Sequence, residues 1–326
     1  MMGATRSIAS SWGMHIPGLA RKYMFILFAA ACFSLLLLAT ALPETVGFDT
    51  QWIYKYYGDG SEKPVANGIP LRIMTLGASV CRGDLSNGTV GFRQPLRDKL
   101  VSVGNMVNMV GSERVGEMKD NDVEAHGGNR VDQVHEWATH SVPGTKPNLF
   151  IMNVGSNDCL QHYDLPNYNV RLNDFINYLL QESPRGTVMM STLLTNTVPD
   201  VEPCILYLNQ QIRELYKALS EQGRPVVLAE MHDHYVPEGD TLERPHPPDI
   251  TPDGTHPDDV GYAKMARIFY QTIREANRKG FFQRAEDVGI PDDGDVGREV
   301  ETQILADQLE TVPPPFRNRR FARRKL

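Results

Sequence analysis

The stretch "IMTLGASVCRG", residues 73–83, decides the fold of this chain. A short, mainly apolar run ends at Gly77, and Ser79 follows two residues later. An apolar run without alternation is typical of a strand that is covered on both faces. Ser79 therefore either caps the next helix or stands as a nucleophile just past the end of a buried strand. The rest of the chain has to decide between these two roles.

Runs of the same kind recur along the chain and alternate with amphipathic stretches. The predicted strands are Leu71–Leu76, Met106–Val110, Leu149–Val154, Val188–Leu194 and Val226–Ala229. Apolar residues at helical spacing predict helices around residues 172–180, 208–219 and 265–273. Strand and helix in alternation predict an α/β fold, a three-layer α/β/α sandwich with a five-stranded parallel sheet. Ligands bind such sheets beyond the carboxyl ends of the strands.

The two ends of the chain differ from its middle. Residues 23–42 are an uncharged apolar run after Arg21 and Lys22, with a small-x-small pattern at 39–41. Residues 1–42 are thus a signal peptide or a signal anchor, and cleavage is favoured. Either reading predicts a secreted or lumenal protein. We expect an irregular lead-in over residues 43–70, the folded domain over 71–280 and a disordered acidic-then-basic tail over 281–326.

Composition excludes some functions. The net charge of −7 argues against a nucleic-acid partner, because binding of phosphates needs a basic face. The chain carries neither a glycine-rich phosphate loop nor a dinucleotide fingerprint, so no cofactor is expected. In "HEWATH", residues 135–140, the histidines are five residues apart and diverge by about 140° on a helix, so no metal site is predicted. "MHDHY", residues 231–235, either lines the pocket or forms a solvent-facing loop.

Polar residues follow the predicted strands at the edge where a site should lie. They are Ser79, Gly127-Gly128, Asn157 and the pair Asp253 and His256. Taken singly, each is more often a cap or a turn residue. Together they supply a nucleophile, a base, a residue to orient the base and donors for an oxyanion. This combination predicts acyl transfer.

Four segments resemble the four blocks of the SGNH (GDSL-type) hydrolase superfamily, in the same order over roughly residues 70–278. They read Gly77-Ala78-Ser79-Val80, "HGGNRVD" at 126–132, Gly155-Ser156-Asn157-Asp158 and Asp253-Gly254-Thr255-His256. Ala78 departs from the aspartate of the family motif. "MVGSERVGEMKDNDVEAHGGNR", residues 109–130, is similar to fungal secreted members that act on acetylated polysaccharides. The fold that this resemblance implies is the SGNH, flavodoxin-like one.

The resemblance also implies the role of each residue. Ser79 would be the nucleophile, His256 the general base and Asp253 the residue that orients His256. The backbone N–H groups of Ser79 and Gly128 and the Asn157 side chain would form the oxyanion hole, with Gly127 as an alternative donor to Gly128.

Cysteines and a sequon fit an oxidising compartment. Cys159 and Cys204 follow the third and fourth predicted strands, so we expect a disulfide between them, the alternative being two separate buried thiols. Cys81 should lie under the site as a free thiol. Asn87-Gly88-Thr89 is a glycosylation sequon.

The sequence therefore predicts a serine esterase for short acyl groups, most of all acetyl groups on a polysaccharide. The alternatives are a lysophospholipase or lipase, an O-acetyltransferase, and a carbohydrate-binding relic without activity. The expected partners are a small ester or an acetylated polysaccharide, and a membrane if residues 23–42 stay attached as an anchor.

Overall fold

β1 (Leu71–Gly77) is the central strand of the computed structural model, which describes residues 62–295. All seven of its residues are buried, which explains why the run is mainly apolar, and Arg72 and Thr75 are buried with the rest. Of the predicted segments, residues 1–42, most of the lead-in and residues 296–326 lie outside the described part. None of the helices within residues 62–295 is long and apolar enough to cross a membrane.

The sheet around β1 has seven strands, not the five expected. They are β1, β2 (Val107–Val110), β3 (Glu113–Arg114), β4 (Asp122–Ala125), β5 (Leu149–Asn153), β6 (Thr187–Ser191) and β7 (Val226–Ala229). Their order is β3-β4-β1-β5-β6-β7, and β2 also pairs with β1. All pairings are parallel except that of β3 with β4. The five predicted strands are present, and β3 and β4 are the two that were missed.

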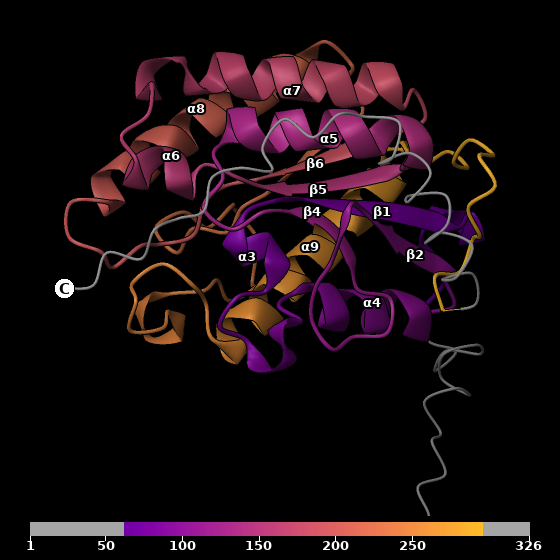
Figure 1. Ribbon diagram of the computed structural model, residues 1–326, viewed down its shortest axis with the longest axis horizontal. Helices are drawn as coiled ribbons and strands as arrows, with labels where there is room; N and C mark the ends of the chain where they lie inside the picture. Colours follow the sequence, from indigo (N-terminus) through magenta and orange to yellow (C-terminus); the bar gives the residue numbers. More distant parts are fainter. Residues whose placement is uncertain (1–61, 296–326) are drawn as a thin grey trace, which may run out of the picture. The chain divides into compact units, whose positions relative to one another are not determined.

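Helices cover both faces of the sheet and make the three layers that were predicted (Figure 1). They are α3 (Ser79–Arg82), α4 (Arg93–Ser102), α5 (Val131–Thr145), α6 (Ser156–Leu160), α7 (Tyr168–Glu182), α8 (Glu202–Glu221) and α9 (Asp259–Arg278). Alternate residues of β1 enter two separate cores. Ile73 packs with α4 and α9 on one face, and Met74 packs with α5, α7 and α8 on the other.

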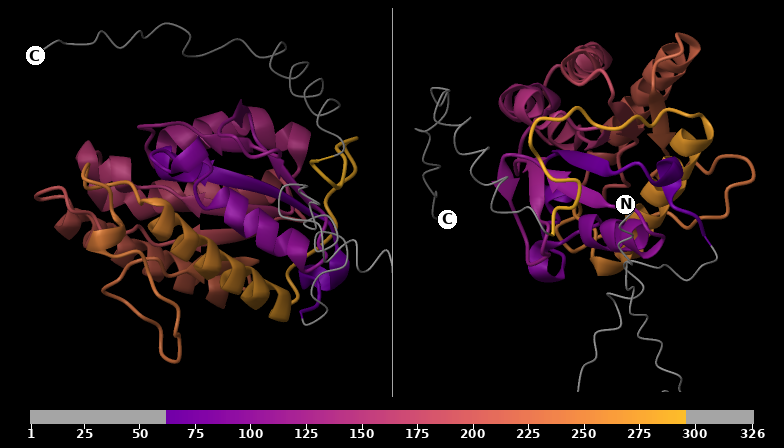
Figure 2. Two further views of the ribbon diagram at one scale, coloured as in Figure 1. Left: turned by 90° about the horizontal axis from the view of Figure 1, so that it is seen from below. Right: turned by 90° about the vertical axis from the view of Figure 1, so that its right-hand side faces the viewer.

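The segment 281–295 does not fit the expected disordered tail, because it packs against the amino ends of the strands. Figure 2 (right) looks at this end of the sheet, where the yellow chain after α9 crosses it. Arg72 donates hydrogen bonds to the carbonyl oxygens of Glu286 (3.0 Å) and Ile290 (3.2 Å). Asn148 donates to the carbonyl oxygen of Gln283 at 2.8 Å. The folded unit therefore extends beyond residue 280.

Candidate active site

Ser79 is the first residue of α3 and lies two residues past the carboxyl end of β1. Gly77 makes this turn possible, since a Cβ there would lie 2.4 Å from the carbonyl oxygen of Asn153 on β5. The cap position belongs to Ala78, and no side chain caps the helix, so the capping role considered for Ser79 is wrong. The Ser79 N–H has no acceptor among the described residues, as expected for the first N–H of a helix.

Cys81 lies under this turn as a free, fully buried thiol. Its S–H can donate to two carbonyl oxygens, that of Leu76 at 3.3 Å and that of Asn153 at 3.4 Å. Burial raises the pKa of Cys81 to about 12. Because the thiolate is the reactive form of cysteine, Cys81 is not a nucleophile here.

Asn157 stands in α6, which begins just past the end of β5. Gly155 has a φ of +133°, and a Cβ at this position would meet the Tyr168 hydroxyl at 2.8 Å, so the position requires glycine. The Asn157 amide donates one hydrogen bond to the carbonyl oxygen of Asn129 at 3.1 Å. An amide NH₂ has two donors, which leaves one for a ligand.

The loop between β4 and α5 carries the two glycines. Gly128 has a φ of +82°, and its carbonyl oxygen accepts a hydrogen bond of 2.8 Å from Gln161. Neither the Gly127 nor the Gly128 N–H donates to another residue in the described part of the chain. The loop is joined to the Asn157 region on two sides, through Asn129 and through Gln161.

His256 and Asp253 are joined within one turn before α9. His256 Nδ1 forms a short hydrogen bond with Asp253 Oδ2. The other carboxylate oxygen accepts from the Thr255 N–H (3.0 Å), the His256 N–H (3.1 Å) and the Thr251 hydroxyl (2.8 Å). Burial opposes the charge, but these hydrogen bonds outweigh it and lower the pKa of Asp253. His256 Nε2 is buried and has no hydrogen-bond partner between residues 62 and 295.

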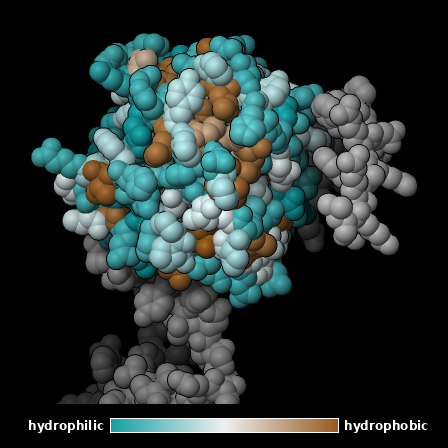
Figure 3. Space-filling model, turned by 90° about the vertical axis from the view of Figure 1, so that its left-hand side faces the viewer, coloured by the Kyte–Doolittle hydropathy of each residue, from teal (hydrophilic) through white to brown (hydrophobic). Residues whose placement is uncertain are grey.

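A narrow cleft at the carboxyl ends of the strands brings Ser79 and Asn157 together with the turn that carries His256. Its lining includes Ser79, Asn157 and Thr255, the neighbour of His256. About 270 Å³ of space, including the open mouth, is free of atoms. Figure 3 shows this end of the molecule, where hydrophilic side chains surround smaller groups of apolar ones. A serine hydroxyl, an imidazole with a free buried nitrogen, a carboxylate and several unused N–H donors suffice for nucleophilic acyl transfer.

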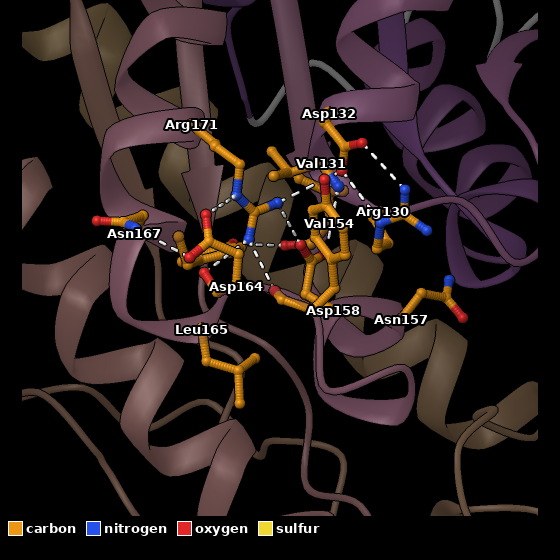
Figure 4. A network of polar contacts seen from close by, with 12 residues as sticks. Arg130, Val131, Asp132, Val154, Asn157, Asp158, Asp164, Leu165, Asn167 and Arg171 are labelled. Carbon is orange, nitrogen blue, oxygen red and sulfur yellow. Dashed lines mark hydrogen bonds and ion pairs between the residues drawn. The ribbon is translucent and has the colours of Figure 1, made fainter.

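A polar network behind Asn157 was not foreseen from the sequence (Figure 4). Asp158 is fully buried, forms an ion pair of 2.6 Å with Arg171 on α7, and accepts a hydrogen bond of 3.2 Å from the Val131 N–H at the start of α5. Arg130 bonds to Gln161 at 2.6 Å. The network ties α6 to the loop that carries Gly128. Its members are far apart in sequence, so only the fold reveals it.

Cys159 and Cys204 form a disulfide with a Cα–Cα distance of 5.7 Å. Cys159 lies two residues after Asn157 on α6, and Cys204 lies on α8. The bond therefore fixes the helix that carries Asn157 to a long helix of the outer layer.

Comparison with known proteins agrees with this geometry. The profile of the family described as GDSL-like lipase/acylhydrolase matches residues 73–269, more than half of the chain. The comparison with curated protein sequences found no match.

Similar solved structures include three esterases. A family 3 carbohydrate esterase from Clostridium thermocellum has 24% identity and a TM-score of 0.54 over 64% of this chain and 97% of its own. An acetyl esterase, crystallised as an S10A mutant with an acetate ion, has 20% identity and a TM-score of 0.52 over 64% of this chain and 98% of its own. A family 3 carbohydrate esterase from Talaromyces cellulolyticus gives the same four values. At these identities the likeness shows the fold.

The family match spans the segments of Ser79, Gly128, Asn157 and His256. Of these segments, those of Ser79 and Asn157 line the cleft, together with Thr255 beside His256. The chain belongs to the GDSL-like lipase/acylhydrolase family, the SGNH hydrolases, and is a carboxylic ester hydrolase.

Proposed function

We propose that this hydrolase is a secreted serine esterase that removes short acyl groups, above all acetyl, from a polysaccharide. Ser79 Oγ attacks the ester carbonyl carbon while His256 Nε2 takes the hydroxyl proton. The proton then passes to the leaving alcohol oxygen, and an acyl-Ser79 ester remains. Water attacks this ester with the same base, and the carboxylic acid leaves. No cofactor takes part.

The observation that carries the proposal is the state of the His256 ring. Its Nδ1 is held by Asp253, while its Nε2 is buried without a partner among the described residues. An imidazole bound in this way is kept in the tautomer that accepts a proton at Nε2. Thr255, the neighbour of His256, lines the same cleft as Ser79. This placement supports transfer of a proton from the Ser79 hydroxyl to His256.

Three donors without an acceptor among the described residues support the stabilisation of an oxyanion, and those of Ser79 and Asn157 belong to the cleft lining. They are the N–H groups of Ser79 and Gly128 and the second amide hydrogen of Asn157. Such donors lower the barrier because they are in place before negative charge develops on the carbonyl oxygen.

Two further observations support an acetylated carbohydrate as the substrate. The cleft is narrow, which favours a short acyl chain. One of the similar structures is an acetyl esterase with an acetate ion, and two others are family 3 carbohydrate esterases.

A secreted location is supported by the apolar run at 23–42 and by the disulfide, because disulfides persist mainly in oxidising compartments. Asn87 of the sequon is exposed in a short turn, so a glycan can be attached there. The same location fits residues 23–42 as an anchor.

The test uses residues 43–326, wild type beside Ser79→Ala, on esters of increasing acyl length and on acetylated xylan. We expect hydrolysis of acetyl esters by the wild type and none above background by the variant. A preference for long acyl chains would indicate a lipid substrate instead. Acetyl transfer to an added sugar acceptor would indicate a transferase. A folded wild type that neither turns over esters nor reacts with a fluorophosphonate probe would contradict the proposal.

A further inference from the structure

A second group of reactive side chains lies at the carboxyl end of β7, outside the parts assigned to ester hydrolysis. Glu202 at the start of α8 and His232 and His234 after β7 each offer one donor atom, and these atoms lie within 4.8 Å of one another. His232 Nε2 is 3.0 Å from Glu202 Oε1, and His234 Nδ1 is 4.0 Å from the same oxygen. Among the described residues, these three are the histidines and carboxylates whose donor atoms lie close enough to share one metal ion.

The burial of these three side chains is graded. The side chain of His232 is fully buried, that of Glu202 is 24% exposed and that of His234 is 63% exposed. Although His232 Nε2 is close to Glu202, the two are not aligned for a hydrogen bond, and Nε2 has no other partner in the described part of the chain. A buried imidazole nitrogen therefore faces a carboxylate oxygen at ion-pair distance, and a cation bound by both atoms would take the place of the proton between them.

We propose that Glu202, His232 and His234 bind one divalent transition-metal ion, with Zn²⁺ as the best fit. Two imidazole nitrogens and one carboxylate oxygen are the donor set of three-ligand zinc sites, which keep a fourth position for water. Imidazole donors favour zinc, copper, nickel or iron over calcium and magnesium. Donor atoms on a tetrahedral zinc ion lie about 3.4 Å apart, since each bond is about 2.1 Å. The exposed His234 side chain closes the remaining gap by rotation.

The residue between the two histidines supplies a supporting contact. Asp233 Oδ1 lies 3.3 Å from His232 Nδ1. Histidines that bind a metal through one ring nitrogen commonly donate the other N–H to a carboxylate, which fixes the ring orientation. In this structure Nδ1 accepts a hydrogen bond of 3.2 Å from the His234 N–H. In the metal-bound form His232 would bind the ion through Nε2, and Nδ1 would then carry the ring proton and donate it to Asp233 in place of that bond.

Glu202 also connects the proposed site to the cleft. Its Oε2 accepts a hydrogen bond of 2.7 Å from the Asn196 N–H, and Asn196 Nδ2 donates to Thr255 Oγ1 at 3.1 Å. Thr255 lines the cleft. A bound ion would hold α8, the segment after β7 and this link together, so its expected effect is on stability. The proposal does not rest on the substrate or on the triad.

The test measures metal binding directly, without a substrate. The full chain, purified without a polyhistidine tag and stripped with a chelator, is titrated with Zn²⁺ by calorimetry. We expect one ion per chain and no comparable binding of Ca²⁺. His234→Asn and Glu202→Gln should each raise the dissociation constant at least tenfold. Co²⁺ should give the visible absorption of a four-coordinate site in the wild type only.

His162→Asn is the matched control, because His162 is an exposed histidine outside the group. It should bind Zn²⁺ as the wild type does. Zn²⁺ should also raise the melting temperature of the wild type and of this control, but not that of His234→Asn. The proposal is overturned if the wild type binds no stoichiometric Zn²⁺, or if His234→Asn binds it as tightly as the wild type does.

Discussion

The nucleophile side of the cleft is built from strand ends that are paired in register, whereas on the His256 side the hydrogen bonds to Asp253 come from within one turn. Gly77 at the end of β1 pairs with Asn153 at the end of β5, so the positions of Ser79 and Asn157 depend on the whole sheet. Asp253 instead accepts hydrogen bonds from within residues 251–256. The difference suggests that the two sides can be disturbed separately.

The largest effect is expected from Ser79→Ala, which removes the attacking atom and leaves the strand pairing intact. The turnover number should fall by about 10⁶-fold, with an unchanged melting temperature. Ser156→Ala is the matched control, since Ser156 lines the same cleft. Both variants are measured on a short-chain chromogenic ester, and turnover kept by Ser79→Ala would show that the Ser79 hydroxyl is not the nucleophile.

Asp253→Asn tests the turn of residues 251–256, which carries His256. The amide cannot keep His256 in the same tautomer, so the turnover number should fall on the order of 10⁴-fold. Asp258→Asn, at the cap of the following helix, should keep full activity because asparagine caps equally well. A similar small effect for both variants would mean that His256 does not depend on Asp253.

Asn157→Ala tests the nucleophile side through a single donor. Loss of one oxyanion donor should lower the turnover number by about 10²–10³-fold and change the Michaelis constant little. Asn167→Ala is the control, since Asn167 is exposed and its side chain donates to Asp164 on the surface. An effect confined to the Michaelis constant would instead assign Asn157 to binding of the substrate.

The disulfide tests how far the nucleophile side depends on distant structure. Replacement of Cys159 and Cys204 by serine opens a link between residues 45 positions apart, and should lower the free energy of unfolding by about 2–4 kcal/mol. Denaturation with urea measures this loss. Because the network around Asp158 remains, the turnover number should change only a few-fold. A large loss of activity at full folding would make the disulfide part of the positioning of Asn157.

The smallest effect is the dependence of stability on pH. The pKa of Asp253 is lowered, so its charge contributes stability above the ordinary pKa of about 3.9, and this contribution is lost as the pH falls through the lowered value. The gap in melting temperature between the wild type and Asp253→Asn should therefore narrow from about pH 6 to below about pH 4. A gap that widens in acid would contradict the lowered pKa.

The sequence was sufficient for the five apolar strands and for the segments that build the cleft, because both leave local patterns. β4 left none. Its Asp122 and Glu124 are buried charges, and Glu124 is held by the Ser112 N–H at 3.0 Å and by His126 at 2.8 Å. Because half of its residues are charged, the sequence of β4 does not predict a buried strand, and its structure depends on tertiary contacts.

The boundary at residue 280 was missed for a similar reason. The segment 281–295 is acidic and poor in large apolar residues from Glu286 onward. It is attached by the buried Phe282 and Ile290, and by side chains of the domain that donate to its backbone carbonyl oxygens. Those carbonyl groups are present in any sequence, so composition does not reveal them. The network of Asp158 and Arg171 likewise required the fold.

The packing of residues 281–295 also bears on how this protein should be shortened for crystallisation. A chain cut at residue 280, as composition alone would suggest, would take from the buried Arg72 and Asn148 the acceptors that residues 283–290 supply, and it would uncover the surface that the segment packs against. Aggregation of that shorter product would be mistaken for an intrinsic property of the hydrolase domain. A stop codon after residue 295 keeps those partners, and it lies at the end of the sheet opposite the cleft.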